Sequence, residues 1–227
     1  MDVVIAGGHG QIARILTRLL HARGDAVRAL VRRQEHLADV ETDGARGVLL
    51  DLEHASVDDV AAALAGADAV VFAAGAGPGS GIARKDTVDR AASVLTADAA
   101  ERAGVRRVVQ ISSMGTDRVR DGAAPTGVDD VFVAYLRAKA AAEHDLRCRD
   151  GLDATILRPG RLTDQPGTGM VTLAPSVAPG SVPRADVAAT LVALLDQPAT
   201  AGLTLELVEG HSSPTDAVRA LADHQEA

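Results

Sequence analysis

The sequence contains almost no aromatic residues, very few lysines and a single cysteine. Aromatic side chains make up 1% of the 227 residues, tryptophan is absent, and only two of the 23 basic residues are lysines. Because Cys148 stands alone, the chain has no intrachain disulfide and no multi-cysteine metal site, which is typical of a reducing compartment. We therefore expect a cytoplasmic protein in which any tyrosine or lysine is conspicuous.

Long apolar runs and an excess of positive charge are missing as well. No run approaches the roughly 20 apolar residues of a membrane span, and no signal peptide is expected after Met1. The formal net charge of −8 comes without a basic stripe, which disfavours nucleic-acid binding. The seven histidines show no paired metal-ligand spacing. We expect no membrane, nucleic-acid or metal partner, and either a monomer or a homodimer.

The hydrophobic pattern predicts a single α/β domain over residues 1–227. Short β-branched runs alternate with longer segments of helical period, which is typical of βαβ units in a doubly wound parallel sheet. The expected strands cover residues 2–6, 26–31, 46–50, 67–74, 107–112, 154–157 and 203–208. The expected helices cover 11–22, 86–103, 129–148, 184–195 and 214–222, and another begins at Ser56, where Asp59 completes a capping box.

Two segments rich in glycine and proline follow strand ends, where ligands bind in open α/β sheets. The first covers residues 75–81 and the second runs from 159 to 180. We expect residues 159–182 to form a small substrate-side lobe or lid, with a short strand at 170–173.

A glycine turn, AGGHGQIA, joins the first expected strand to the first expected helix. Gly7 permits the tight turn, Gly10 lets backbone amides approach a pyrophosphate, and Ala13 allows close helix–strand packing. The N-terminus of the helix adds partial positive charge. This spacing predicts a dinucleotide site, with a tight turn that binds nothing as the alternative.

The second expected strand ends in VRALVRR, without the acidic residue that usually binds the ribose 2′-hydroxyl of NAD. Arg32 and Arg33 offer guanidinium groups to a 2′-phosphate, unless they are merely solvated residues at a strand end. Asp51 is placed either to accept a hydrogen bond from the adenine amino group or to cap a loop. We therefore expect NADP as the cofactor, with NAD less favoured.

The only tyrosine, Tyr135, stands four residues before Lys139, so the two share a helix face. A nearby ammonium lowers the pKa of a phenol from about 10, which predicts Tyr135 as a proton donor assisted by Lys139. Lys139 is also expected to hold the nicotinamide ribose; an exposed helical pair is the alternative. Ser112 and Ser113 end the fifth expected strand, and Ser113 is predicted to orient a substrate carbonyl, although a strand-end cap explains either serine equally well.

The other lysine, Lys85, begins a helix after the first glycine-rich segment, together with Asp86 and Asp89. Contact with substrate or cofactor is one interpretation of these charges. A solvated helix start is the interpretation that the sequence favours.

Six segments, in this order, resemble the short-chain dehydrogenase/reductase superfamily: AGGHGQIA, VRALVRR, QISSMG, YLRAKAAAE, ILRPGRLTDQPGTG and VPRADVA. The resemblance is to its atypical NAD(P)-binding branch, with NmrA-like and flavin- or biliverdin-reductase-like members, and it covers nearly the whole chain. It implies a Rossmann fold with strand order 3-2-1-4-5-6-7. It also implies that the cofactor is bound by Gly7, His9, Gly10, Gln11, Ile12, Asp51, Leu52, Ala73, Ala74 and Gly75. The nicotinamide is then expected near Pro159 and Gly160, with Leu162 and Thr163 close behind.

Two functions are compatible with these features. The first is an NADP-dependent oxidoreductase that transfers a hydride to or from a small carbonyl-like or conjugated substrate. The second is a non-catalytic, NmrA-like sensor of NAD(P). Two features depart from the family pattern. Ser113 precedes Tyr135 by more than the usual spacing. The substrate segment is shorter than in sugar-nucleotide epimerases, so a bulky nucleotide sugar is disfavoured as the substrate.

Overall fold

The structure is a computed structural model that describes residues 1–77 and 79–223. Its main sheet comprises β1 (Asp2–Ala6), β2 (Ala26–Val31), β3 (Arg46–Leu49), β4 (Ala69–Phe72), β5 (Arg107–Ile111), β6 (Asp153–Pro159), β8 (Val171–Ala174) and β10 (Thr204–Glu209). A second, two-stranded sheet pairs β7 (Arg161–Thr163) with β9 (Ser181–Pro183). The α-helices are α1 (Gln11–Ala22), α2 (Leu37–Thr42), α3 (Val57–Leu64), α4 (Ile82–Arg84), α5 (Ala92–Ala103), α6 (Asp130–Arg147), α7 (Arg184–Leu195) and α8 (Pro214–Asp223).

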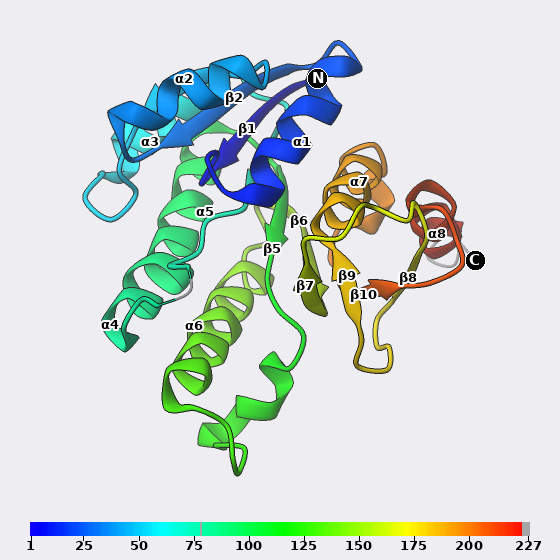
Figure 1. Cartoon of the computed structure of the whole chain (residues 1–227). Helices are drawn as coiled ribbons and strands as arrows, with labels where there is room; N and C mark the ends of the chain where they lie inside the picture. The colour runs from blue at the N-terminus through cyan, green and yellow to red at the C-terminus, as the bar shows by residue number, and fades with distance from the viewer. Residues whose placement is uncertain (78, 224–227) are drawn as a thin grey trace.

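The strands of the main sheet follow the order β3-β2-β1-β4-β5-β6-β10-β8. All neighbours pair in parallel except β10 and β8, which pair antiparallel at one edge. Helices cover both faces of the sheet (Figure 1). The Rossmann fold and the expected order of seven strands are confirmed, with β10 as the seventh. The short strand expected at 170–173 is present as β8, and it extends the main sheet.

Alternation along the central strands separates two cores. Val3 of β1 packs in one core with Leu16 of α1 and Leu191 of α7. Its neighbour Val4 packs in the other core with Leu64 of α3 and with α5. Each such fully buried side chain stabilises the fold by about 1.5–3 kcal/mol. Since both faces are covered, the central strands are almost wholly apolar, as the sequence predicted.

Local signals located several boundaries correctly. α1 and α7 match the expected ranges, and the Ser56–Asp59 capping box is formed: the Asp59 amide donates to the Ser56 hydroxyl at 3.2 Å, and the Ser56 amide donates to the Asp59 carboxylate at 2.9 Å. The segment expected to form a lobe supplies β7, β8 and β9. No helix within residues 1–77 and 79–223 has the length and apolar character needed to cross a membrane.

The helix expected over residues 86–103 is interrupted. Residues Lys85–Ala91 form a π-helical segment between α4 and α5, and such wide turns occur often at functional sites. Lys85 is only 8% exposed and Asp89 is fully buried, whereas Asp86 is exposed and pairs with Arg90. The solvated helix start is therefore confirmed for Asp86 and wrong for Lys85 and Asp89.

Two arginines of α1 bind the residue that follows α2. Asp43 is buried and accepts hydrogen bonds from Arg14 Nε and, at 2.6 Å, from Arg18 Nη1. Burial by itself raises the pKa of Asp43, but these hydrogen bonds outweigh burial and lower the pKa below its ordinary value. This ion pair therefore attaches α2 to the helix that follows the glycine turn.

We expect Asp43→Asn to lower the free energy of unfolding by about 2 kcal/mol at pH 7, because a charge-assisted hydrogen bond is lost. The pKa of Asp43 in the folded protein lies below its unfolded value of about 4. The stabilisation by Asp43 is therefore fully present above about pH 4, and it disappears as the pH falls through the folded-state pKa. Urea unfolding at pH 7 and at pH 3 measures both effects. Asp58→Asn, in an exposed pair with Arg102, is the control; equal losses for the two variants would contradict this assignment.

Candidate cofactor and active site

The glycine turn touches the strands on both sides of β1. Gly7 has φ +83°, and a Cβ on it would lie 2.6 Å from the Cα of Ala74, beyond the end of β4. A Cβ on Gly8 would lie 2.6 Å from the Cβ of Ala29 in β2. Glycine is therefore required at both positions by backbone approach. Sequence reasoning found the turn at Gly7 and missed the packing role of Gly8.

The N-terminus of α1 is open to a ligand. Gly10 is the N-cap residue, no side chain caps the helix, and its first turn contains no acidic residue. Gly10, Gln11 and Ile12 all line a cavity. Uncapped amides and the positive end of the helix dipole match the chemistry of a pyrophosphate. The residues present therefore fit a dinucleotide at this turn.

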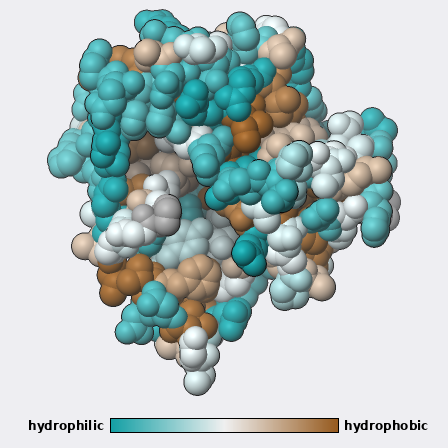
Figure 2. All heavy atoms as spheres, in the orientation of Figure 1, coloured by the Kyte–Doolittle hydropathy of each residue, from teal (hydrophilic) through white to brown (hydrophobic). Residues whose placement is uncertain are grey.

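Two adjoining cavities meet at the turn. The first has a volume of about 320 Å³ and is lined by Gly7, His9, Gly10, Arg32, Asp51, Leu52, Ala73, Ala74 and Gly75 among the expected residues. The second has a volume of about 540 Å³ and is lined by Gly10, Gln11, Ile12, Ala73, Ala74, Gly75, Ser112, Tyr135, Lys139 and Leu162 among them. Figure 2 shows a hollow in this face of the molecule, with apolar surface below it in the region of α4 and α6.

Several expected residues line neither of these two cavities: Arg33, Ser113, Pro159, Gly160 and Thr163. Arg33 Nη1 lies 3.6 Å from Glu35 Oε1. The backbone amide of Gly160 donates to the carbonyl of Leu207. A Cβ on Gly160 would collide with the carbonyl oxygen of Gly180, so close packing explains this glycine.

Charges at the outer end of the first cavity include two residues that sequence reasoning missed. Arg84 Nη2 donates to Glu53 Oε2 at 2.6 Å, and Arg32 Nη1 lies 3.9 Å from the same oxygen. The hydrogen bond from Arg84 is the main cause that lowers the pKa of Glu53. Two guanidinium groups therefore face one carboxylate. Arg84 comes from α4, far along the chain, and no local pattern linked it to Arg32.

His9 and Asp51 have partners within the protein. The ring of His9 stacks on that of His36 with centroids 3.6 Å apart, and its Nε2 lies 2.7 Å from Asp39 Oδ2. Asp51 Oδ1 accepts the backbone amide of Glu53 at 3.0 Å. Both residues line the first cavity, and Asp51 also caps the loop after β3.

Tyr135 lies close to both lysines of the chain. Lys85 Nζ is 5.4 Å from the centroid of the Tyr135 ring, and Lys139 Nζ is 6.0 Å from it. Among residues 1–77 and 79–223, the phenol hydroxyl has no hydrogen-bond partner. Lys139 is 3% exposed, so the alternative of an exposed helical pair is wrong. The scarcity of lysine was the signal that could also have found Lys85.

Lys139 is held at the ends of two strands. Its ammonium donates to the carbonyls of Ile111 at 3.2 Å and Ala74 at 3.4 Å. It also lies 3.3 Å from Asp89 Oδ1, at ion-pair distance but outside hydrogen-bonding geometry. Asp89 Oδ2 accepts the amide of Ala76 at 3.3 Å. Asp89 therefore balances the charge of Lys139 and ties the loop after β4 to the helical segment.

The two serines after β5 have different surroundings. Ser112 Oγ donates to Glu143 Oε1 at 2.5 Å, and Ser113 Oγ donates to the carbonyl of Met114 at 3.1 Å. Ser112 lines the second cavity and Ser113 does not. A carboxylate only accepts hydrogen bonds, so the Ser112 hydroxyl directs its proton to Glu143, and the lone pairs of the serine oxygen remain available to accept a hydrogen bond.

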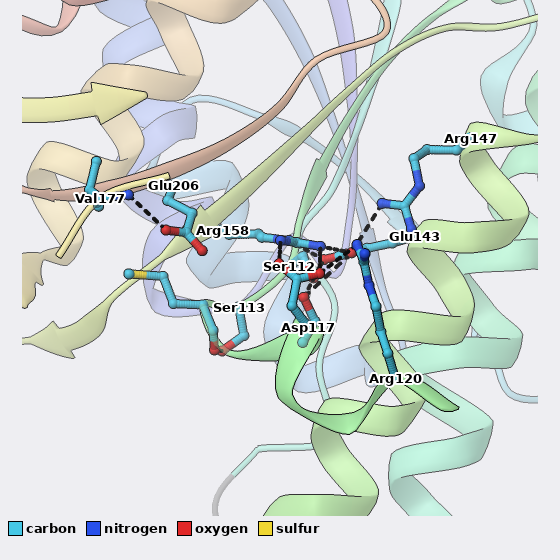
Figure 3. A network of polar contacts seen from close by, with 11 residues as sticks. Ser112, Ser113, Asp117, Arg120, Glu143, Arg147, Arg158, Val177 and Glu206 are labelled. Carbon is cyan, nitrogen blue, oxygen red and sulfur yellow. Dashed lines mark hydrogen bonds and ion pairs between the residues drawn. The ribbon is translucent and has the colours of Figure 1, made fainter. Parts of the chain in front are cut away.

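Glu143 is the centre of a buried network that joins α6 to β6 (Figure 3). Arg158 donates Nε to Glu143 Oε1 at 2.9 Å and Nη2 to Oε2 at 2.6 Å, and its Nη1 donates to Asp117 at 2.7 Å. Burial lowers the pKa of Arg158, but the hydrogen bonds with Glu143 and Asp117 outweigh burial and raise it above its ordinary value. Sequence reasoning missed this network, although Tyr135, Lys139 and Glu143 share helical spacing on α6.

Comparison with known proteins decides the family. Residues 7–198 match the family described as NAD(P)H-binding. The chain belongs to this family. A *Bacillus subtilis* member named as an uncharacterized sugar epimerase is 34% identical over 222 residues, which covers 97% of this chain and 100% of that protein.

Solved structures agree with this assignment. A *Bacillus halodurans* protein, provisionally named an NAD-dependent epimerase/dehydratase, matches with a TM-score of 0.87 and 34% identity over 97% of this chain and 99% of that one. An anaerobillin reductase from *Escherichia coli* O157:H7 matches with a TM-score of 0.78 and 26% identity over 92% and 97% of the two chains. The resemblance to epimerase- and reductase-like members of the atypical short-chain superfamily is thus confirmed, and the protein binds a nicotinamide dinucleotide.

We expect Gly10→Val to weaken dinucleotide binding at least tenfold while the protein stays folded. The backbone of Gly10 is extended, with φ −62° and ψ 151°, a conformation open to any residue, and an added Cβ would lie 3.3 Å from the carbonyl oxygen of Gly7, a tight contact that a small shift relieves. The valine side chain would occupy the cavity beside the uncapped amides. Titration calorimetry and circular dichroism measure binding and folding. Gly8→Ala is the contrasting variant, since its Cβ would clash with Ala29 and lower stability first. Unchanged binding by folded Gly10→Val would exclude a cofactor at this turn.

Proposed function

We propose that the protein is an NADP-dependent oxidoreductase that transfers a hydride to or from a small carbonyl-like or conjugated substrate. The observation that carries this proposal is the placement of Tyr135 close to both Lys85 and Lys139, in a cavity that adjoins the glycine turn. When bound, the nicotinamide supplies or accepts the hydride. The likeness to an anaerobillin reductase supports the reductase class.

The chain's own groups would bind the dinucleotide at two points. The amides at the start of α1 receive the pyrophosphate. Lys139 has three ammonium protons, of which two are directed to the carbonyls of Ile111 and Ala74. Its third proton makes no hydrogen bond within residues 1–77 and 79–223, where Asp89 Oδ1 lies 3.3 Å from Nζ, and it is available to a ribose hydroxyl, which is the role predicted from the sequence.

Tyr135 is the proposed proton donor. Its hydroxyl has no partner among the described residues, so it is available to a substrate oxygen. In the reductive direction the phenol gives its proton to that oxygen, and in the oxidative direction the phenolate takes the proton back. The ammonium groups of Lys85 and Lys139 stabilise the negative charge that develops on the phenolate.

The serines contribute differently from the sequence-based expectation. For Ser113 to orient a substrate carbonyl, its hydroxyl would have to leave the carbonyl of Met114. For Ser112, the hydroxyl would have to leave the carboxylate of Glu143. With this bond kept, Ser112 presents lone pairs and accepts a hydrogen bond from an O–H or N–H of a ligand. We therefore propose Ser112 as an acceptor in the cavity.

Cofactor choice rests on charge at the outer end of the first cavity. Glu53 is neutralised by Arg84, and Arg32 adds a further positive charge. A 2′-phosphate suits this arrangement better than a 2′-hydroxyl does. We therefore propose NADP over NAD.

We expect NADPH to bind more tightly than NADH, and Arg32→Asp to remove most of the difference because a carboxylate repels the 2′-phosphate. Arg33→Asp should have a smaller effect, since Arg33 pairs with Glu35 and lies outside the cavity lining. Calorimetric titration of both cofactors measures the preference. Equal affinities in the unmodified protein would contradict it.

We expect Tyr135→Phe to bind NADPH normally and to turn over substrate about 10²–10⁴ times more slowly, because only the proton donor is lost. Lys139→Arg should impair both binding and turnover, since a planar guanidinium does not replace a compact ammonium between strand carbonyls and ribose. Quinones, flavins and small aldehydes are the first probes. An unchanged rate in Tyr135→Phe would exclude the proton-donor role. If no probe oxidises bound NADPH, the result favours the sensor function.

A further inference from the structure

Lys85 is a buried cation that pairs with no carboxylate of residues 1–77 and 79–223. Its side chain makes one hydrogen bond, from Nζ to the carbonyl of Gly77 at 2.9 Å, and no ion pair with any carboxylate of the described residues. We propose that Lys85 is the binding subsite for a carboxylate carried by the substrate. This inference rests on the proposed function, because it places the substrate in the same cavity as Tyr135.

The carboxylates around Lys85 are already engaged. Asp86 pairs with Arg90, and Asp89 lies beside the ammonium of Lys139. Asp129, which also lines the cavity, accepts the amides of residues 131 and 132 as the N-cap of α6. Lys85 therefore keeps an uncompensated positive charge at the cavity wall. Burying a charge is costly unless the charge is paired, so an anionic ligand gains from binding here.

The hydrogen-bonding capacity of Lys85 is also unfilled. An ammonium has three protons, and Gly77 accepts one of them. The carbonyl of Gly77 is shared with the hydroxyl of Ser80, which donates to it at 2.9 Å. The two remaining protons of Lys85 match the two oxygens of a carboxylate, which forms stronger bonds to an ammonium than a neutral amide does.

The position of Lys85 limits the shape of the substrate. Lys85 Nζ lies 5.4 Å from the centroid of the Tyr135 ring, so the carboxylate binds near the phenol that meets the reacting oxygen. Phe132, Leu162 and Ile111 contribute apolar surface to the same cavity. The substrate class is thus a carbonyl compound with an apolar or aromatic body and a carboxylate at a short distance from the carbonyl.

A purely structural role for Lys85 makes a different prediction. If its ammonium only holds the loop at Gly77, its loss affects charged and neutral ligands alike. Stabilisation of the Tyr135 phenolate by Lys85 is common to every substrate, so its loss also affects charged and neutral substrates alike. The ratio of kcat/KM, or of affinity, between a carboxylate ligand and its neutral analogue therefore reports on the subsite alone.

The first experiment compares 4-formylbenzoate with 4-formylbenzamide as substrates for NADPH oxidation at pH 7. The two probes share ring and aldehyde and differ in charge. We expect kcat/KM to favour the carboxylate by about tenfold or more, Lys85→Met to bring the ratio close to one, and Lys85→Arg to retain part of it. A ratio near one in the unmodified protein, or an unchanged ratio in Lys85→Met, would overturn the subsite.

The second experiment needs no turnover and separates the two proposals. Benzoate and benzamide are titrated by saturation-transfer NMR into protein loaded with NADP⁺, whose phosphates occupy the glycine turn. Preference for benzoate that disappears in Lys85→Met supports the subsite even if neither aldehyde is reduced, in which case only the proposed reaction fails. Equal binding of benzoate and benzamide by the unmodified protein overturns the subsite whether or not the aldehydes react.

Discussion

The buried ion pair between Glu143 and Arg158 determines where α6 lies on the sheet. Glu143 is fully buried, and the desolvation of both charges is offset by the hydrogen bonds that the carboxylate accepts from Ser112, Thr116, Arg147 and Arg158. Tyr135 and Lys139 stand on the same helix, so the position of this carboxylate also sets the position of the phenol and the ammonium. The proposed chemistry thus depends on a contact that lies outside the reacting groups.

Positively charged side chains line the candidate site, although the chain as a whole is acidic. The chain is acidic, with a net charge of −8, yet Arg32, Arg84, Lys85 and Lys139 meet along the cavities at the carboxyl ends of the strands. Four carboxylates line the same cavities: Glu53 pairs with Arg84, Asp89 lies beside Lys139, and Asp51 and Asp129 accept backbone amides. The two cavity linings together contain five Arg or Lys and four Asp or Glu residues, so the site is less acidic than the chain as a whole, which favours anionic ligands there.

Ser112 and Ser113 show a limit of predicting side-chain direction from the two-residue alternation of a strand. Alternation along the expected strand 107–112 predicts that one of the two serines faces inward, and the prediction of Ser113 rests on this alternation. β5 ends at Ile111, so neither serine follows the two-residue period, and it is Ser112 that lines the cavity. Lys85 and Asp89 lie in the π-helical segment and are buried, whereas the sequence favoured a solvated helix start for both. Local backbone geometry of this kind has no strong signature in side-chain pattern.

The sequence by itself determined the extent of α1, the glycine turn and the placement of Tyr135 and Lys139 on one helix face, because each depends on residues close together in the chain. The order of the parallel strands was expected only from the resemblance to the short-chain superfamily, since neighbours in a sheet can lie far apart in the sequence. Tertiary structure alone decided which distant charges meet: Arg84 with Glu53 beside Arg32, Arg158 with Glu143, and Lys85 with Tyr135. These contacts join elements through the packing of helices on a twisted sheet, where the distance between two side chains is set by the whole fold rather than by their spacing in the sequence.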